Sequence, residues 1–174
     1  MPRRTIAIAA ALSVLALGSP LITGCTNPLA TQYFNQGVEK YETGNYQGAI
    51  DDWSKAIEIN PQNAAAYYNR GDAKDNLGDD QGEISDYTKE IEINPQNVIA
   101  YYNRGVSKGN LEDYQGAISD YTKVIEINPQ YASAYYNRGI ARELVNDLAG
   151  ACSDWRKAAD FGLKEPAQWV KNQC

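Results

Sequence analysis

The sequence contains no histidine and only three cysteines. Histidine is the side chain whose charge changes near neutral pH, so its absence excludes Ser-His-Asp triads, histidine general bases and histidine-containing zinc sites. Three thiolates are also too few for a four-cysteine metal centre. We therefore expect no enzymatic activity, no catalytic or metal-binding residues, no cofactor and no small-molecule substrate.

Basic residues are also scarce, because the chain has 16 lysines and arginines against 22 acidic residues. Arg3 and Arg4 belong to an acid-free first segment, so the remainder is more acidic still. A protein that binds nucleic acid needs clustered basic residues, since much of its affinity comes from neutralising phosphates. The scattered bases predict that this chain does not bind nucleic acid and that its partners are proteins.

The first 24 residues have the composition of a secretory signal peptide. A short basic region ending at Arg4 precedes an uncharged apolar run from Thr5 to Leu17, and a Gly-Ser-Pro break follows. The apolar run is shorter than the roughly 20 residues that a transmembrane helix needs. We predict that residues 1–24 are removed from the mature protein and do not span the membrane.

The end of this segment resembles the cleavage box of bacterial lipoproteins. Ile22, Thr23 and Gly24 place one aliphatic and two small residues directly before Cys25. The resemblance implies that Cys25 is lipidated and that residues 25–29 link it to the rest of the chain. It also implies a location in the bacterial cell envelope, membrane-anchored and facing the periplasm or an equivalent compartment. Residue 26 is not the aspartate that retains enteric lipoproteins at the inner membrane, which favours the outer membrane.

The remaining sequence repeats with a period of 34 residues. The run Ala-Tyr-Tyr-Asn-Arg-Gly begins at Ala66, Ala100 and Ala134. The run Ile-Asn-Pro-Gln begins at Ile59, Ile93 and Ile127. A fixed period of this length indicates stacked structural repeats. Four copies follow, each numbered from its own position 1: residues 30–63, 64–97, 98–131 and 132–163.

Each copy resembles the tetratricopeptide repeat (TPR) family in length and in residue types. Positions 4 and 24 are aromatic and position 8 is glycine in all four copies, and position 32 is proline in the first three. Positions 4, 8 and 11 form one helical stripe, and Ile50, Trp53 and Ile57 form another. The resemblance implies an all-α fold, a right-handed α-α superhelix (solenoid) of four TPR helix hairpins. Residues 164–174 are predicted to form a capping helix over the last apolar face.

The resemblance also implies that the first helix of each copy lines a concave groove. There, position 5 is aromatic and position 6 is asparagine in every copy. An asparagine amide both donates and accepts hydrogen bonds, so a row of them can bind the backbone of an extended peptide. We predict peptide binding by Phe34, Tyr68, Tyr102, Tyr136, Asn35, Asn69, Asn103 and Asn137. The alternative is that each asparagine bonds the adjacent repeat and that the tyrosines are amphipathic surface.

Charged residues recur at fixed positions too. Arginine at position 7 accompanies aspartate at position 23 in copies 2 to 4. Opposite charges repeated in register favour ion pairs between helices over a ligand site.

Copy 2 departs from the pattern, because Asp80, Glu83 and Glu90 stand where an aromatic and two small residues are expected. A buried carboxylate is costly without a partner. Either the helix pair packs loosely, with the carboxylates reaching solvent or lysine, or the carboxylates form a polar notch. The sequence leaves open whether these acids are functional or tolerated.

Cys152 and Cys174 are the cysteines that remain once Cys25 carries lipid. An exported protein enters an oxidising compartment, where disulfides form. We predict a disulfide between them that pins the capping helix. The alternative is a buried Cys152 and a loose terminal thiol.

These features predict a lipid-anchored TPR adaptor that binds a polypeptide segment in its groove. We expect it to support assembly of an envelope or membrane protein complex. One TPR subclass binds the C-terminal carboxylate of heat-shock chaperones through basic groove residues, but here only Asn69 matches that pattern. The alternative function is a structural protein that oligomerises through its solenoid ends.

Overall fold

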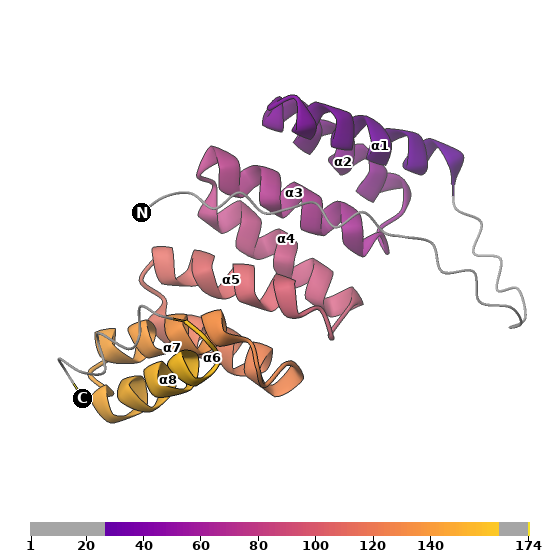
Figure 1. The fold of residues 1–174 in the computed structure, drawn as a ribbon. Coiled ribbons are helices and arrows are strands. Elements are labelled where there is room, and N and C mark those ends of the chain that lie inside the picture. The colour runs from indigo at the N-terminus through magenta and orange to yellow at the C-terminus, as the bar shows by residue number, and fades with distance from the viewer. Residues whose placement is uncertain (1–26, 164–173) are drawn as a thin grey trace, which may run out of the picture.

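The computed structural model describes residues 27–163 and residue 174. Residues 27–163 contain α-helices and no strand. Each helix packs against the next in chain order, which gives a stack running from α1 to α8 (Figure 1). The helices are α1 (Pro28–Glu42), α2 (Tyr46–Ile59), α3 (Ala64–Leu77), α4 (Asp80–Ile93), α5 (Val98–Asn110), α6 (Tyr114–Ile127), α7 (Ala132–Leu144) and α8 (Leu148–Asp160).

The all-α fold that the TPR resemblance implied is confirmed for the described residues, and each of their helices contacts the next along the chain. The organisation into four TPR hairpins stays a prediction, as does the right-handed superhelical sense. The signal peptide, the lipidation of Cys25 and the capping helix fall outside the described residues, apart from Cys174. Among the helices that are described, none has the length and apolar character needed to cross a bilayer.

Polar residues and prolines set the helix ends. The second helices of copies 1 to 3 end at Ile-Asn before proline, because proline disfavours α geometry in the residue that precedes it. Most helices begin with an asparagine or aspartate whose side chain accepts a backbone N–H, which satisfies a donor that the helix leaves unpaired. Asn27 caps α1 in this way, so the helix begins at Pro28, two residues before the predicted start of copy 1.

The turn within each copy needs a left-handed residue at position 15. Copies 1 and 2 use Gly44 (φ 78°) and Gly78 (φ 76°), which adopt this conformation without steric cost. Copies 3 and 4 hold Glu112 (φ 62°) and Asn146 (φ 65°) in the same region. The turn geometry is therefore common to all four copies even where glycine is missing.

The glycine at position 8 allows the two helices of a copy to approach closely. A β-carbon built on Gly139 would lie 2.4 Å from the indole nitrogen of Trp155, and one on Gly37 would lie 2.5 Å from that of Trp53. Each indole is held in place, because its N–H donates to the carbonyl oxygen of Phe34 or Tyr136. The ring at position 24 thus occupies the space that a side chain at position 8 would need.

Gly139→Ala is expected to lower the free energy of unfolding by about 1–3 kcal/mol, because the methyl group forces Trp155 from its site. Gly71→Ala is the matched control. Its β-carbon would lie 3.0 Å from Tyr87, a contact that a small ring movement relieves, so we expect a loss below about 1 kcal/mol. Urea denaturation followed by circular dichroism measures both. Equal losses for the two variants would contradict the argument.

The repeated arginines join three helices, and the predicted inter-helix ion pairs are confirmed. Arg104 of α5 donates through Nε and Nη2 to both carboxylate oxygens of Asp120 in α6, at 2.9 and 2.6 Å. Its Nη1 donates to the hydroxyl of Thr88 in α4, in the preceding copy, at 3.0 Å. Lys108 also binds Asp120, at 2.8 Å. Arg70 and Arg138 repeat this arrangement.

Candidate functional site

The first helices α1, α3, α5 and α7 present positions 5, 6 and 9 side by side, and we call these residues the first-helix face. Hydrogen bonds cross it between neighbouring copies. The amide nitrogen of Asn137 donates to the hydroxyl of Tyr102 at 2.9 Å, and that of Asn103 donates to Tyr68 at 3.4 Å. The hydroxyl of Tyr41 donates to Asp72. Polar contacts therefore link each copy to the next along this face, although position 5 of copy 1 and position 9 of copies 1, 3 and 4 are apolar.

The four predicted asparagines fall into two classes. Asn103 and Asn137 bond the adjacent repeat, which is the alternative to peptide binding that the sequence left open. Asn69 cannot do the same, since the residue opposite it in copy 1 is Phe34, which has no hydroxyl. Asn35 is exposed and Asn69 is half-buried. Among the residues that the structure describes, Asn35 and Asn69 are thus the two position-6 asparagines whose amides form no bond between copies.

The aromatic residues of position 5 are less accessible than expected. Tyr102 is only 8% exposed, and its ring packs 5.3 Å from that of Tyr131 and 5.9 Å from that of Tyr121. The prediction of Tyr102 as a groove-lining contact differs from the structure, because the ring fills the space between copies 3 and 4. Phe34, Tyr68 and Tyr136 are half-buried. Burial raises the pKa of Tyr68 to about 12, so its hydroxyl stays neutral.

A polar group at copy 2 was missed by the sequence reasoning. Asp72 occupies position 9, where the other copies have Val38, Val106 and Ile140. It accepts a hydrogen bond from Tyr41, whose hydroxyl also accepts one from the amide of Asn76 at 3.1 Å. Burial raises the pKa of Asp72. The sequence already contained an indication of this polar group, because Asp72 is the one charged residue at position 9 among the four copies.

Glu83 and Glu90 are buried, with 2% of each side chain exposed. The interpretation that they reach solvent or lysine is therefore wrong for both. Glu83 is hydrogen-bonded to Ser107, and the amide of Asn97 donates to Glu90 at 2.8 Å. Asp80 is half-buried in the first turn of α4. Burial raises the pKa of Glu83 to about 8, with nearby carboxylates adding to the effect, and burial also raises the pKa of Glu90.

In the part of the chain that the structure describes, no group of three or more cysteine, aspartate or glutamate side chains is arranged to hold a metal ion.

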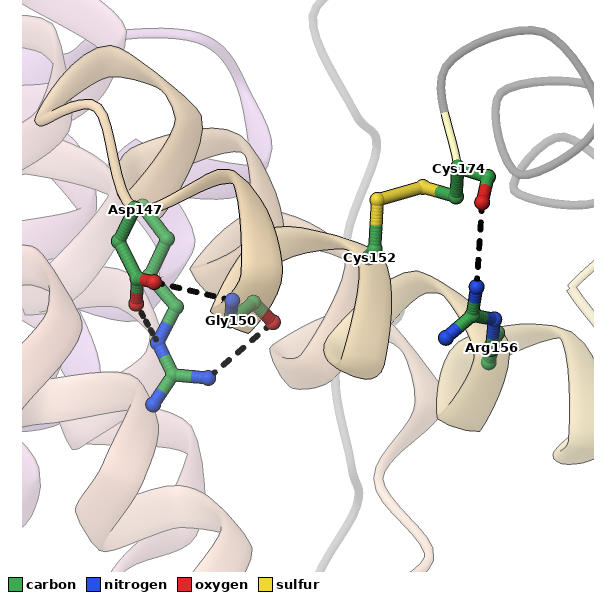
Figure 2. The surroundings of a disulfide bond; sticks show 6 residues. Asp147, Gly150, Cys152, Arg156 and Cys174 are labelled. Atoms are coloured by element: carbon green, nitrogen blue, oxygen red, sulfur yellow. Dashed lines mark hydrogen bonds and ion pairs between the residues drawn. A yellow bond between two sulfur atoms is a disulfide. The ribbon is translucent and has the colours of Figure 1, made fainter.

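Cys152 and Cys174 are joined by a disulfide in the structure, with their Cα atoms 5.7 Å apart (Figure 2). Cys152 lies in α8, so the bond attaches the last residue of the chain to the last described helix. Arg156, one turn further along α8, donates to the carbonyl oxygen of Cys174 at 3.4 Å. The end of the chain is thus held at two points.

Three family models match this sequence. One, described as TPR repeat, matches residues 37–78. Two others, described as tetratricopeptide repeat, match residues 64–97 and 98–131. The chain belongs to the tetratricopeptide repeat family. Two of the matched TPR segments have the bounds of copies 2 and 3. Among curated proteins, none matches the sequence.

Solved TPR structures resemble the fold closely. MamA superposes with a TM-score of 0.74 at 25% identity, covering 82% of this chain and 83% of MamA. YrrB, described as a TPR protein with an unusual peptide-binding site, has a TM-score of 0.74 at 24% identity, covering 82% and 74%. The first TPR of Spaghetti (RPAP3), bound to the HSP90 peptide SRMEEVD, has a TM-score of 0.64 at 24% identity, covering 68% and 94%. These similarities establish the TPR fold.

Proposed function

We propose that this TPR protein is a lipid-anchored adaptor that binds a polypeptide segment on its first-helix face and supports assembly of a membrane protein complex in the envelope. The observation that carries the proposal is the pair of amides at Asn35 and Asn69. Both lie at position 6, and neither is used between copies. An extended peptide backbone offers the donors and acceptors that two such amides need.

Two relatives support a polypeptide ligand. YrrB is described as having a peptide-binding site, and the RPAP3 domain is bound to a peptide. An acidic chaperone tail is a poor ligand for the present chain. Lys40, Lys74 and Lys108 are the basic residues of the first helices in copies 1 to 3 apart from the arginines, and all three pair with buried aspartates.

A lipid anchor at Cys25 would determine where the protein binds its ligand. Helix α1 begins at Pro28, so two residues separate it from Cys25. A linker of this length reaches at most about 10 Å, even when fully extended. A lipidated Cys25 would therefore hold the first-helix face next to the membrane surface, where a segment of a membrane protein is accessible.

The proposal is tested by photo-crosslinking in the native membrane. A photoreactive amino acid at residue 35, on the first-helix face, is compared with one at exposed Ser119 on α6. We expect a discrete polypeptide adduct at residue 35 only, and loss of both adduct and membrane fraction in Cys25→Ser. An adduct formed only by the photoreactive amino acid at residue 119 would indicate that the ligand binds the second helices. Adducts consisting only of a second copy of the chain would favour the oligomerising alternative.

The captured partner then allows an affinity measurement. Asn35→Ala with Asn69→Ala is expected to weaken binding roughly tenfold, since each amide bond contributes about 1 kcal/mol net. The melting temperature should stay unchanged, because neither amide joins two copies. Asn137→Ala, which removes the bond to Tyr102, is the matched control for a structural asparagine. If the double variant binds as tightly as the parent, the two amides are not ligand contacts.

A further inference from the structure

The contact between copies 2 and 3 differs from the other contacts between copies. At position 20, the other copies place an alanine that is at most 1% exposed, and at position 27 an alanine or valine that is fully buried. Copy 2 has glutamate at both positions and buries them equally well. The residues compared are Ala49, Glu83, Ala117 and Ala151 at position 20, and Ala56, Glu90, Val124 and Ala158 at position 27. Two carboxylates therefore occupy sites that are apolar elsewhere.

Glu83 bonds a residue of copy 3, and Glu90 bonds the residue that caps the first helix of copy 3. Glu83 meets Ser107 of α5, at position 10, where copies 2 and 4 have alanine. Asn97, which caps α5, donates to Oε1 of Glu90, while Oε2 of Glu90 has no hydrogen-bond partner among the described residues. The helices α4 and α5 are thus connected through two carboxylates.

Ser107 can bond either protonation state of Glu83. Its bond to the ionised form lowers the pKa of Glu83, but burial has the larger and opposite effect. The serine hydroxyl has one proton, and it donates that proton to the carbonyl oxygen of Asn103 at 2.9 Å. A protonated Glu83 can donate to the serine oxygen and satisfy both groups. An ionised Glu83 must instead take the serine proton away from Asn103.

The charges around Glu83 also oppose its ionisation. Asp72 and Asp75 of α3 and Asp80 of α4 all raise the pKa of Glu83. Glu83 in turn contributes to the raised pKa of the Tyr87 phenol. Within residues 27–163, no lysine or arginine forms an ion pair with Glu83 or Glu90. The bases of copy 2 bind other carboxylates: Arg70 and Lys74 bind Asp86, and Lys89 binds Glu92.

We propose that the α4–α5 contact is a pH-dependent joint. With both glutamates neutral, α1–α4 and α5–α8 pack as one rigid unit. When Glu83 ionises, the contact loosens and the two halves move independently. Because the bond from Asn103 to Tyr68 crosses the joint, its opening also interrupts the first-helix face.

The direction of the pH effect follows from the folded and unfolded states. Burial and the neighbouring carboxylates raise the pKa of Glu83 from 4.5 to about 8 in the folded protein. The folded state then binds more protons than the unfolded state between these two values. Stability therefore falls as the pH rises through this window and levels off above it.

The test compares the parent protein with Glu83→Ala combined with Glu90→Ala, which restores the small residues of the other copies. Between pH 5.5 and pH 9, we expect the melting temperature of the parent to fall by about 5–10 °C more than that of the variant. Urea unfolding is followed by circular dichroism and by tryptophan fluorescence, since Trp53 lies in copy 1 and Trp155 in copy 4. For the parent, the two curves should coincide at pH 5.5 and separate at pH 9. For the variant, they should coincide at both.

Glu83→Gln is the second variant, because it keeps the shape and hydrogen-bonding ability of Glu83 without its charge. The melting temperature of Glu83→Gln should fall with pH as little as that of the double alanine variant. If the double alanine variant does not fold, Glu83→Gln alone tests the proposal. Equal pH dependence in the parent and in Glu83→Gln, with coincident unfolding curves at pH 9, would overturn the proposal. A titration of the Glu83 side-chain carbon by NMR with a midpoint below pH 5.5 would overturn it as well.

Discussion

Arg104→Gln is expected to lower the free energy of unfolding by about 3 kcal/mol, because it leaves a buried carboxylate poorly paired. Asp120 is 3% exposed and receives two of its hydrogen bonds from Arg104. The variant also removes the bond to Thr88 in the preceding copy. Lys108 still contacts Asp120, which keeps the loss below that of an isolated buried charge. Urea denaturation of the two proteins measures the difference.

Lys123→Gln is the matched control, since it also removes one cation from an ion pair of copy 3. Lys123 binds Glu126 at 3.0 Å, but their side chains are 43% and 58% exposed. Exposed pairs contribute little, so the expected loss is much smaller than that of Arg104→Gln. Similar effects for Arg104→Gln and Lys123→Gln would show that burial of Asp120 does not strengthen the pair.

Cys174→Ser is expected to cost about 3 kcal/mol of stability by releasing the end of the chain. The disulfide joins residues 22 positions apart, and closing such a loop restricts the unfolded chain. Thermal unfolding with and without reductant provides the measurement. Reductant should lower the melting temperature of the parent to that of Cys174→Ser and should leave the variant unchanged.

Counting thiols gives an independent check of the same bond. When the protein is denatured and delipidated without reduction, an alkylating reagent should modify neither Cys152 nor Cys174. Alkylation of both residues would show that the bond does not form in the protein, and the stability difference would then need another cause.

Contacts within one copy were predictable from the sequence. The period places Gly139 and Trp155 in the same hairpin, and Arg104 with Asp120 likewise, so residue types and spacing suffice to pair them. The end of α2 at Ile59 follows from the Asn-Pro pair that comes next. These elements depend on local geometry that every copy shares.

Contacts between copies were less predictable, because they depend on how one hairpin stacks on the next. The sequence alone offered two explanations for Asn137, and the bond to Tyr102 is visible only once α5 and α7 are placed. The sequence left two alternatives for Glu83, a carboxylate that reaches solvent or a lysine and a carboxylate in a polar notch, because a buried carboxylate needs a partner. Ser107 supplies that partner from 24 residues away in the sequence, in the next copy. The substitution of serine for alanine at position 10 was the only sequence signal.

The arginine at position 7 of copies 2 to 4 donates a hydrogen bond to a hydroxyl group in the preceding copy. This contact affects how the number of copies in the chain can change. The hydroxyl that receives it is Ser54, Thr88 or Thr122, always at position 25. If residues 98–131 were lost in frame, Arg138 would meet Thr88 just as Arg104 does now. The same deletion would place Glu83 opposite Ala141, which has no hydroxyl. Gain or loss of whole copies during evolution is therefore tolerated by the arginine bonds, whereas Glu83 ties copy 2 to the particular neighbour that carries Ser107.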